Sequence, residues 1–506
     1  MSLHRGRHPA GGTGNQYDFV LHREMIRGAM RRWVLAATIL GSSMAFIDTT
    51  VINVALPVMQ RELGADVAGA QWIVDAYLLV LSALILAGGA LGDRLGRVRV
   101  FGAGTLLFAV ASIWCGAAPS TGQLIAARAL QGAGAAMLVP GSLAIIAATF
   151  PREERGRAIG TWSSLTSLAI IAGPLLGGIL VQTISWRAVF FINAPIATVV
   201  LWIVWRRMPR DEQEERAAID WLGTFLVTVG LGGVTFAFIE KAPIAGVIGA
   251  VALIAFFFVE RRASNPIVPF SLFRSRSFTG ANVLTFFLYA ALSAATFLLP
   301  FNLIQVQGYS PAQAGAALLP FVATMSVLSR WTGALADRIG PRPLLIAGPL
   351  LSAAGLAWMA WPEIGGSYWT TFFPGILILG LGMSITVAPL TTTVMTSIED
   401  ERYAGAASGI NNAVARVAGL LSIAVLGFVA VLVFTRELDA RLANHPATVR
   451  QTMLAQADRL AEAKSDDPAV QDAVRRAFVA AFRVNLLAAA GLAALSALGA
   501  IGVRRR

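Results

Sequence analysis

Apolar runs of about 20 residues recur from one end of the chain to the other, and short polar segments separate them. A helix of that length spans the hydrocarbon core of a bilayer. The pattern therefore predicts an all-α polytopic membrane protein with about fourteen transmembrane helices. The predicted spans are 33–57, 72–91, 100–118, 124–147, 158–181, 187–205, 221–240, 242–259, 278–306, 311–332, 343–361, 370–395, 404–433 and 484–503.

The composition agrees with this interpretation. Of 506 residues, 56% are hydrophobic and 13% are charged, whereas soluble domains carry about 25% charged residues. A soluble enzyme, a disordered regulator and a fibrous repeat are thereby excluded. The net charge of +12 comes from arginines that lie mostly in short loops between the runs, so it predicts contact with a lipid bilayer and no nucleic-acid partner.

The distribution of basic residues predicts the orientation. The first 32 residues carry six arginines and no apolar run, so they are expected to form a cytoplasmic tail. Alternate segments counted from this tail hold 26 of the 40 basic residues, as the positive-inside rule requires for an even number of spans. Both termini are then cytoplasmic, in the cytoplasmic (inner) membrane. The long segment 434–483 is external, either as a solvated loop or as a partly helical cap.

An internal repeat divides the chain. The sequence Gly89-Ala-Leu-Gly-Asp93-Arg94-Leu-Gly96-Arg97 returns 244 residues later as Gly333-Ala-Leu-Ala-Asp337-Arg338-Ile-Gly340. That offset holds about eight spans, so two six-helix halves in parallel orientation leave one inserted pair between them. The expected units are the tail 1–32, the first half 33–205, the inserted pair with its loops 206–277, the second half 278–503 and the C-terminus 504–506.

These motifs resemble those of the major facilitator superfamily, and in particular its fourteen-helix drug/proton antiporter branch. The repeated loop is similar to the superfamily's cytoplasmic loop signature. Asp48-Thr-Thr-Val-Ile-Asn53-Val-Ala-Leu-Pro57 and Arg128-Ala-Leu-Gln-Gly132-Ala-Gly134 resemble the branch motifs of the first and fourth helices. The resemblance covers about residues 33–505, and it implies a fold of two pseudo-symmetric halves that exchange substrate for protons.

The residues themselves limit the energy source. Neither lysine, Lys241 or Lys464, fits a phosphate-binding loop, and no metal-ligand or nucleophile constellation is visible. We therefore expect a transporter without a cofactor, driven by an ion gradient or by the gradient of its own substrate, and not an enzyme. Asp48 lies about 13 Å below the predicted outer end of its span, and Asp75 and Arg128 also lie in the outer part of the first half.

An ionisable residue inside the membrane indicates a functional site, so Asp48, Arg128 and Asp75 are the candidates for proton coupling. The alternative for Asp48 and Arg128 is a fixed ion pair that holds helices together. The alternative for Asp75 is a side chain that reaches the outer headgroups.

Two further sets are candidates for conformational change. The resemblance implies that the repeated loop acts as a latch between the halves, although a hairpin that only anchors orientation fits the same pattern. The small residues of the fifth span resemble the branch's antiporter motif, with ordinary tight packing as the alternative. The latch set is Gly89, Asp93, Arg94, Gly96, Arg97, Asp337, Arg338 and Gly340, and the fifth-span set is Gly160, Gly173, Pro174, Gly177 and Gly178.

Aromatic and aliphatic residues with few polar groups dominate the expected cavity, which favours lipophilic or amphipathic compounds over sugars and admits a cation near Asp48. The candidate cavity residues are Asn53, Trp162, Phe286, Tyr289 and Arg416. A proton-coupled exporter of drugs or metabolites is the main hypothesis. A facilitator or symporter and a non-transporting receptor are the alternatives. An external segment of this size is also compatible with a periplasmic adaptor protein.

Overall fold

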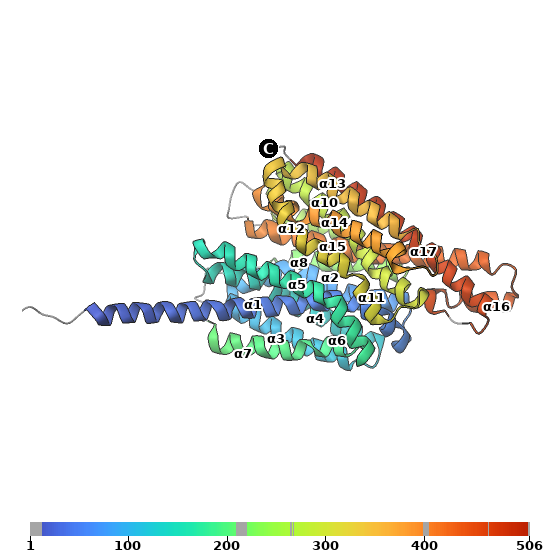
Figure 1. Ribbon diagram of the computed structural model, residues 1–506, viewed down its shortest axis with the longest axis horizontal. Coiled ribbons are helices and arrows are strands. Elements are labelled where there is room, and N and C mark those ends of the chain that lie inside the picture. Colours follow the sequence, from blue (N-terminus) through green and yellow to red (C-terminus); the bar gives the residue numbers. More distant parts are fainter. Residues whose placement is uncertain are drawn as a thin grey trace, which may run out of the picture.

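The structure is a computed structural model that describes residues 13–208, 220–263, 266, 268–397, 404–463 and 465–503. Within these ranges every regular element is helical, and the helices form one elongated bundle (Figure 1). The long α1 projects from one end of the bundle, and α16 lies at the other. We call these the α16 end and the opposite end.

The first half contains six membrane-crossing segments, as predicted. They are α1 (Thr13–Leu63), α2 (Val67–Leu95), α3 (Arg97–Ala117), α4 (Thr121–Thr149), α5 (Arg152–Thr183) and the broken pair α6 (Ala188–Phe191) and α7 (Asn193–Arg207). The inserted pair follows as α8 (Trp221–Ile239) and α9 (Pro243–Glu260), which pack against each other.

The second half repeats the six-segment pattern. Its elements are α10 (Arg276–Phe301) with η1 (Phe270–Arg274) before it and η2 (Asn302–Val306) after it, α11 (Pro311–Ala317) and α12 (Leu319–Ile339), α13 (Pro341–Met359), α14 (Tyr368–Thr396), α15 (Ala404–Arg441), α16 (Ala447–Leu454), η4 (Ala457–Glu462), α17 (Pro468–Ser496) and η5 (Ala497–Gly502). Thirteen helices of the described chain are long and apolar enough to span a membrane. α5, of which Ala172–Thr183 is apolar, supplies the fourteenth crossing.

Several predicted boundaries are wrong, for two physical reasons. Pro57 does not end the first span, because α1 continues to Leu63. A transmembrane helix can contain a proline, since groups on neighbouring helices satisfy the backbone groups that the proline leaves free. Helices α15 and α17 also extend far into the predicted loop 434–483, where α16 and η4 add further helix. The partly helical alternative is therefore correct. Phe434 and Leu438 on α15 and Val474 and Phe478 on α17 are buried there at four-residue spacing, so the two helices keep packing beyond the predicted spans.

The repeated loop adopts the same backbone in both halves. Gly96 joins α2 to α3 with φ +102°, and Gly340 joins α12 to α13 with φ +81°. Only glycine enters this region of φ without strain, which explains why the residue recurs at both turns. Gly92, by contrast, has ordinary space around it. The side chains of Asp93 and Asp337 lie outside the described residues.

The outer face of the bundle suits a lipid environment. Large apolar side chains on α3, α7, α8 and α9 are exposed, as expected for helices that contact acyl chains. Tryptophans lie near both ends: Trp205 (90% exposed) and Trp221 at the opposite end, Trp361 and Trp369 near the α16 end. Such belts mark the two membrane interfaces.

The two halves meet near the α16 end. The side chain of Gln71 on α2 donates to the carbonyl oxygen of Ile423 on α15 at 2.8 Å. Gln305 of η2 donates to Gln60 of α1 at 3.2 Å. The inserted helix α8 packs against both α2 and α15, so it contacts one helix of each half.

The arrangement predicts which side of the membrane each end faces. In a Cys115→Ser background, a cysteine at the exposed Ala443, between α15 and α16, should react with an impermeant thiol reagent in intact cells. A cysteine at the exposed Leu95 should react only in everted vesicles, because the positive-inside rule predicts that the adjoining loop is cytoplasmic. Labelling of Leu95→Cys and not Ala443→Cys in intact cells would reverse the orientation.

Candidate functional site

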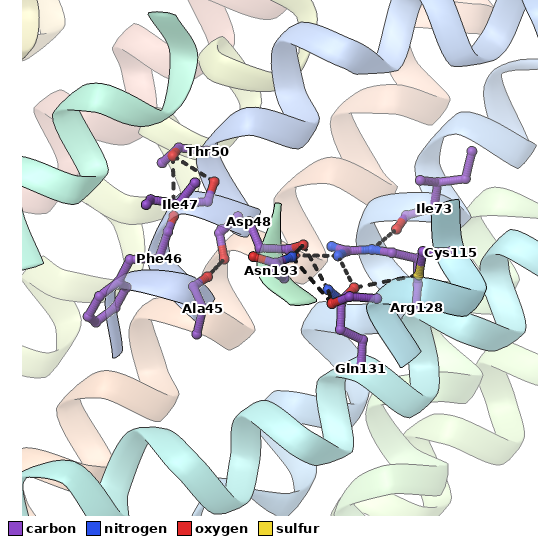
Figure 2. Close-up of polar contacts among 12 residues, drawn as sticks. Ala45, Phe46, Ile47, Asp48, Thr50, Ile73, Cys115, Arg128, Gln131 and Asn193 are labelled. Atoms are coloured by element: carbon purple, nitrogen blue, oxygen red, sulfur yellow. Dashed lines mark hydrogen bonds and ion pairs between the residues drawn. The ribbon is translucent and has the colours of Figure 1, made fainter. Parts of the chain in front are cut away.

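A buried ion pair lies inside the first half. Asp48 is four turns before the end of α1, and Arg128 is two turns into α4; the helices run antiparallel, so the residues meet. Arg128 Nη1 donates to Asp48 Oδ2 at 2.5 Å. Asp48 is 3% exposed to solvent and Arg128 is 1% exposed. The pair that the sequence singled out therefore forms, and Figure 2 shows the side chain of Arg128 extended toward Asp48.

Three polar side chains surround the carboxylate. Gln131, one turn beyond Arg128 on α4, donates to Asp48 Oδ1 at 2.8 Å and to Ser112 Oγ on α3 at 2.8 Å. Asn193, at the start of α7, donates to the same Asp48 oxygen at 3.4 Å and to Ser112 at 3.3 Å. Helices α1, α3, α4 and α7 thus contribute to one buried network (Figure 2).

The guanidinium of Arg128 has partners besides Asp48. Its Nη1 also donates to Gln131 Oε1 at 2.6 Å, and its Nε donates to the carbonyl oxygen of Ile73 on α2 at 2.9 Å. It lies 4.3 Å from the ring centre of Tyr77 and 6.0 Å from that of Phe190. A cation over an aromatic face is stabilised by the ring's quadrupole. Arg128 is consequently held even without the negative charge of Asp48.

Arg128 has neutral partners besides Asp48, and this difference between the two charged residues determines what the cluster can do. Two charges in a low-dielectric interior are expensive to desolvate, and removal of one leaves the other strongly destabilised. Protonation of Asp48 would remove its charge and leave Arg128 with its amide, carbonyl and aromatic partners. The Oδ1 of Asn193 is buried with no hydrogen-bond partner in the described structure, so an acceptor lies unused in the network. The cluster thus joins a buried carboxylate to a guanidinium that has neutral partners of its own.

The other ionisable candidates lie elsewhere. Asp75 on α2 is fully buried, and neither carboxyl oxygen has a hydrogen-bond partner among the described residues. The structure therefore excludes the alternative in which it reaches the headgroups. Arg416 on α15 is half-buried, lies within electrostatic reach of Tyr77, and has a buried Nε with no hydrogen-bond partner among the described residues.

The small residues of α5 serve two different contacts. A Cβ at Gly173 would overlap the hydroxyl of Thr50, and one at Gly177 would lie 3.0 Å from Val51, so these two glycines bring α5 close to α1. A Cβ at Gly178 would overlap the carbonyl oxygen of Pro311 on α11, in the other half. Gly315 on α11 approaches the carbonyl of Pro174 in return. The surroundings of Gly160 on α5 lie outside what the structure describes.

The remaining candidates show no shared binding site. Trp162 on α5 donates to Ser42 at 3.2 Å and packs edge-on against Phe46. Asn53, Phe286 and Tyr289 are half-buried on α1 and α10. In the latch set, Arg94 and Arg338 are exposed, Arg97 is half-buried, and Gly89 has ordinary space around it.

Sequence reasoning missed Ser112, Gln131 and Asn193 as members of the site. Gln131 had a signal, because it lies three residues after Arg128 and so shares its helix face. Asn193 lies in the segment Phe191-Ile-Asn193-Ala-Pro195, which resembles the antiporter branch, but nothing in that segment indicates contact with Asp48. Ser112 had no signal, since only the packing of α3 brings it to the site.

Two parallel six-helix repeats with an inserted pair and a buried ion pair define a polytopic α-helical membrane protein of the transporter architecture. The model of the Major Facilitator Superfamily matches residues 38–423, and the chain belongs to this family.

Among curated proteins, the chain is 34% identical over 433 residues to "Multidrug resistance protein Stp" of Mycobacterium tuberculosis, covering 83% of this chain and 80% of that protein. It is also 34% identical over 436 residues to "Puromycin resistance protein pur8" of Streptomyces alboniger (84% and 86%). The fold resembles a bacterial homolog of the human lysosomal transporter Spinster, in an inward-facing and occupied conformation, with a TM-score of 0.67 and 18% identity over 93% of this chain and 96% of that one.

The ion pair predicts an effect on stability. Arg128→Met leaves Asp48 buried without its counter-charge, which should cost about 3–5 kcal/mol at neutral pH. Asp48→Asn combined with Arg128→Met should recover most of the stability. Thermal unfolding in detergent measures these changes, with the exposed Arg94→Met as a control; equal unfolding temperatures for all variants would contradict the analysis.

The glycine contacts predict an effect on conformation. Gly178→Val and Gly315→Val should separate the halves at the α16 end, because each new side chain meets backbone of the opposite half. Gly122→Val, which has open space around it, is the matched control. Labelling of a cysteine at Pro311 by an impermeant reagent should increase several-fold in Gly178→Val and remain unchanged in Gly122→Val.

Proposed function

We propose that this protein is a proton-coupled antiporter that exports hydrophobic or amphipathic drugs or metabolites across the cytoplasmic membrane by alternating access. Membership of the Major Facilitator Superfamily supports a transporter. Its similarity to a multidrug resistance protein and a puromycin resistance protein supports drug efflux. The buried Asp48–Arg128 pair is the single observation that carries proton coupling.

Coupling requires that the protonation state of Asp48 changes the contacts between helices. When Asp48 is ionised, it joins α1 to α4 through Arg128, to α4 again through Gln131, and to α7 through Asn193. Protonation removes the charge attraction, while Arg128 keeps Ile73, Gln131 and the ring of Tyr77. The link between α1 and α4 therefore weakens selectively.

A continuous set of packed helices connects this site to the opposite half. Thr50 and Val51, just beyond Asp48 on α1, fit against Gly173 and Gly177 of α5. The same stretch of α5 fits against α11 through Pro174 and Gly178. A shift of α1 on protonation would move α5 against the second half. This is a physical basis for coupling protons to alternating access.

The other components of the proposal follow from position. The repeated loops at Gly96 and Gly340, both at the opposite end, act as the latch between states and face the cytoplasm with both termini. Trp162, Phe286, Tyr289, Asn53 and Arg416 line the substrate path, which takes lipophilic compounds and admits cations. No cofactor takes part. The helical external segment around α16 is the surface that would meet a periplasmic adaptor.

Asp48→Asn tests proton coupling directly. It removes the titratable proton but keeps the size and hydrogen-bonding capacity of the side chain. Ethidium accumulation in everted vesicles should lose its dependence on the proton gradient. Binding of neutral compounds should stay within about tenfold, equivalent to 1.4 kcal/mol. Asp48→Glu should retain partial transport with a shifted pH optimum.

A matched control is Asp439→Asn, which changes a carboxylate near the end of α15 that pairs with Arg450 outside the buried network. It should leave coupled transport intact. If Asp48→Asn still acidifies the opposite compartment at the wild-type rate, Asp48 is a packing residue only. If wild-type efflux persists after the gradient is collapsed, the protein is a facilitator.

A further inference from the structure

The junction of α2, α8 and α15 contains a second buried carboxyl group with unusual surroundings. Asp75 is 0% exposed, and neither of its oxygens has a hydrogen-bond partner in the described part of the chain. A buried ionised carboxylate without a counter-charge costs so much free energy that the group takes up a proton instead. Asp75 is therefore held in an environment suited to a neutral carboxylic acid.

The helical register places Asp75 toward the inserted helix. Gln71, one turn earlier on the same face of α2, contacts Ile423 on α15. Trp72 packs against Phe236 of α8, and Leu79 lies beside Gly232 of α8. Asp75 thus falls between the parts of α2 that face α15 and α8.

A hydroxyl of the inserted pair lies at the same depth. Because α2 and α8 run antiparallel, the contacts of Trp72 with Phe236 and of Leu79 with Gly232 bring Asp75 level with Thr235. Thr235 is also 0% exposed, and its hydroxyl has no partner among the described residues. Two turns deeper on the Asp75 face of α2, the hydroxyl of Ser82 is likewise buried and unpaired in the described structure.

An external pocket lies one turn above these groups. Its cavity of about 210 Å³ is lined by residues of α2, α8, α15 and η4, including Gln71 and Ile239. Asp75 follows Gln71 by four residues, and Thr235 precedes Ile239 by four, so each lies directly beneath a residue of the pocket wall. Gln71 is only 2% exposed, and its bond to Ile423 crosses between the halves.

We propose that Asp75 is a second proton-binding site, loaded from the external pocket when Gln71 separates from Ile423, and closed off by that contact in the present conformation. The carboxylate takes a proton from external hydronium, forming an O–H bond on one oxygen and releasing water. Helix α8 forms one wall of this site, which assigns a function to the inserted pair. The contribution of the Asp75 site to export rests on the proton-driven exchange proposed above. The protonation of Asp75 can be measured independently of transport.

The charged and titratable groups on the surrounding elements are consistent with this assignment. The Arg128–Asp48 pair and Cys115 belong to the network on the α4 side of α2, and Arg416 lies two turns deeper than Ile423 on α15. Glu240 accepts from Trp72 at 2.8 Å, and Lys241 pairs with Asp458 at 3.2 Å in the pocket. Asp66 caps the start of α2. None of these groups forms a hydrogen bond or ion pair with Asp75 in the described structure.

Infrared spectroscopy of the purified full-length protein tests the protonation. The carbonyl-stretch band of a protonated carboxylic acid should be present in the wild type at neutral pH and lost in Asp75→Asn. It should persist in Asp48→Asn and in the pocket variant Glu240→Gln, and return at a shifted frequency in Asp75→Glu. A band unchanged in Asp75→Asn would overturn the proposal, as would its disappearance on adding sodium chloride, which would indicate a metal-cation site.

Deuterium exchange of the same band tests the route. Gln71→Ala should accelerate its shift in heavy water at least tenfold, because the side chain that closes the pocket is removed. Gln60→Ala is a matched control, since Gln60 also joins the halves at the α16 end but on α1. Equal acceleration in both variants would contradict a route past Gln71. If Asp48→Asn transports normally while these results hold, the proposed coupling residue fails and the Asp75 site stands.

Discussion

The cost of placing charge in a low-dielectric interior governs the organisation of this protein. Arg128 is nearly inaccessible, yet its guanidinium contacts a carboxylate, an amide, a carbonyl and two aromatic rings from four segments of the first half. Those partners fix α1, α2, α4 and the broken α6–α7 segment relative to one another. Because charge desolvation is so costly, a single proton can alter the balance of contacts between these helices.

The glycines provide the complementary property. Where side chains would hold two helices apart, Gly177 and Gly178 let α5 approach α1 on one side and α11 on the other. Close backbone contact in a membrane depends on van der Waals packing and has few side chains to interlock. At the Gly177 and Gly178 contacts the helices therefore meet through backbone and small side chains. The Asp48–Arg128 site, in which charge interactions are strong, is thus connected to the glycine contacts of α5, in which the helices interact through van der Waals packing.

Much of this architecture could be predicted from the sequence, because hydropathy and the repeated Gly96 and Gly340 turns are local properties. Asp48 and Arg128 stood out because charge is rare in apolar spans. The partners of that pair could not be predicted: Ser112 is an ordinary residue in an apolar helix, and Asn193 reaches the site only through the break between α6 and α7. The continuation of α15 and α17 escaped prediction because charged positions interrupt the apolar pattern that their packing preserves.

The inserted pair separates the repeats in the sequence, but in space α8 covers the line along which α2 meets α15. Deleting α8 and α9 to produce a twelve-helix chain would therefore do more than shorten a linker. It would expose Trp72 and the polar face around Gln71 to hydrocarbon, where unsatisfied polar groups are poorly tolerated. The two halves have consequently become dependent on the insertion, and a twelve-helix version would need a different α2.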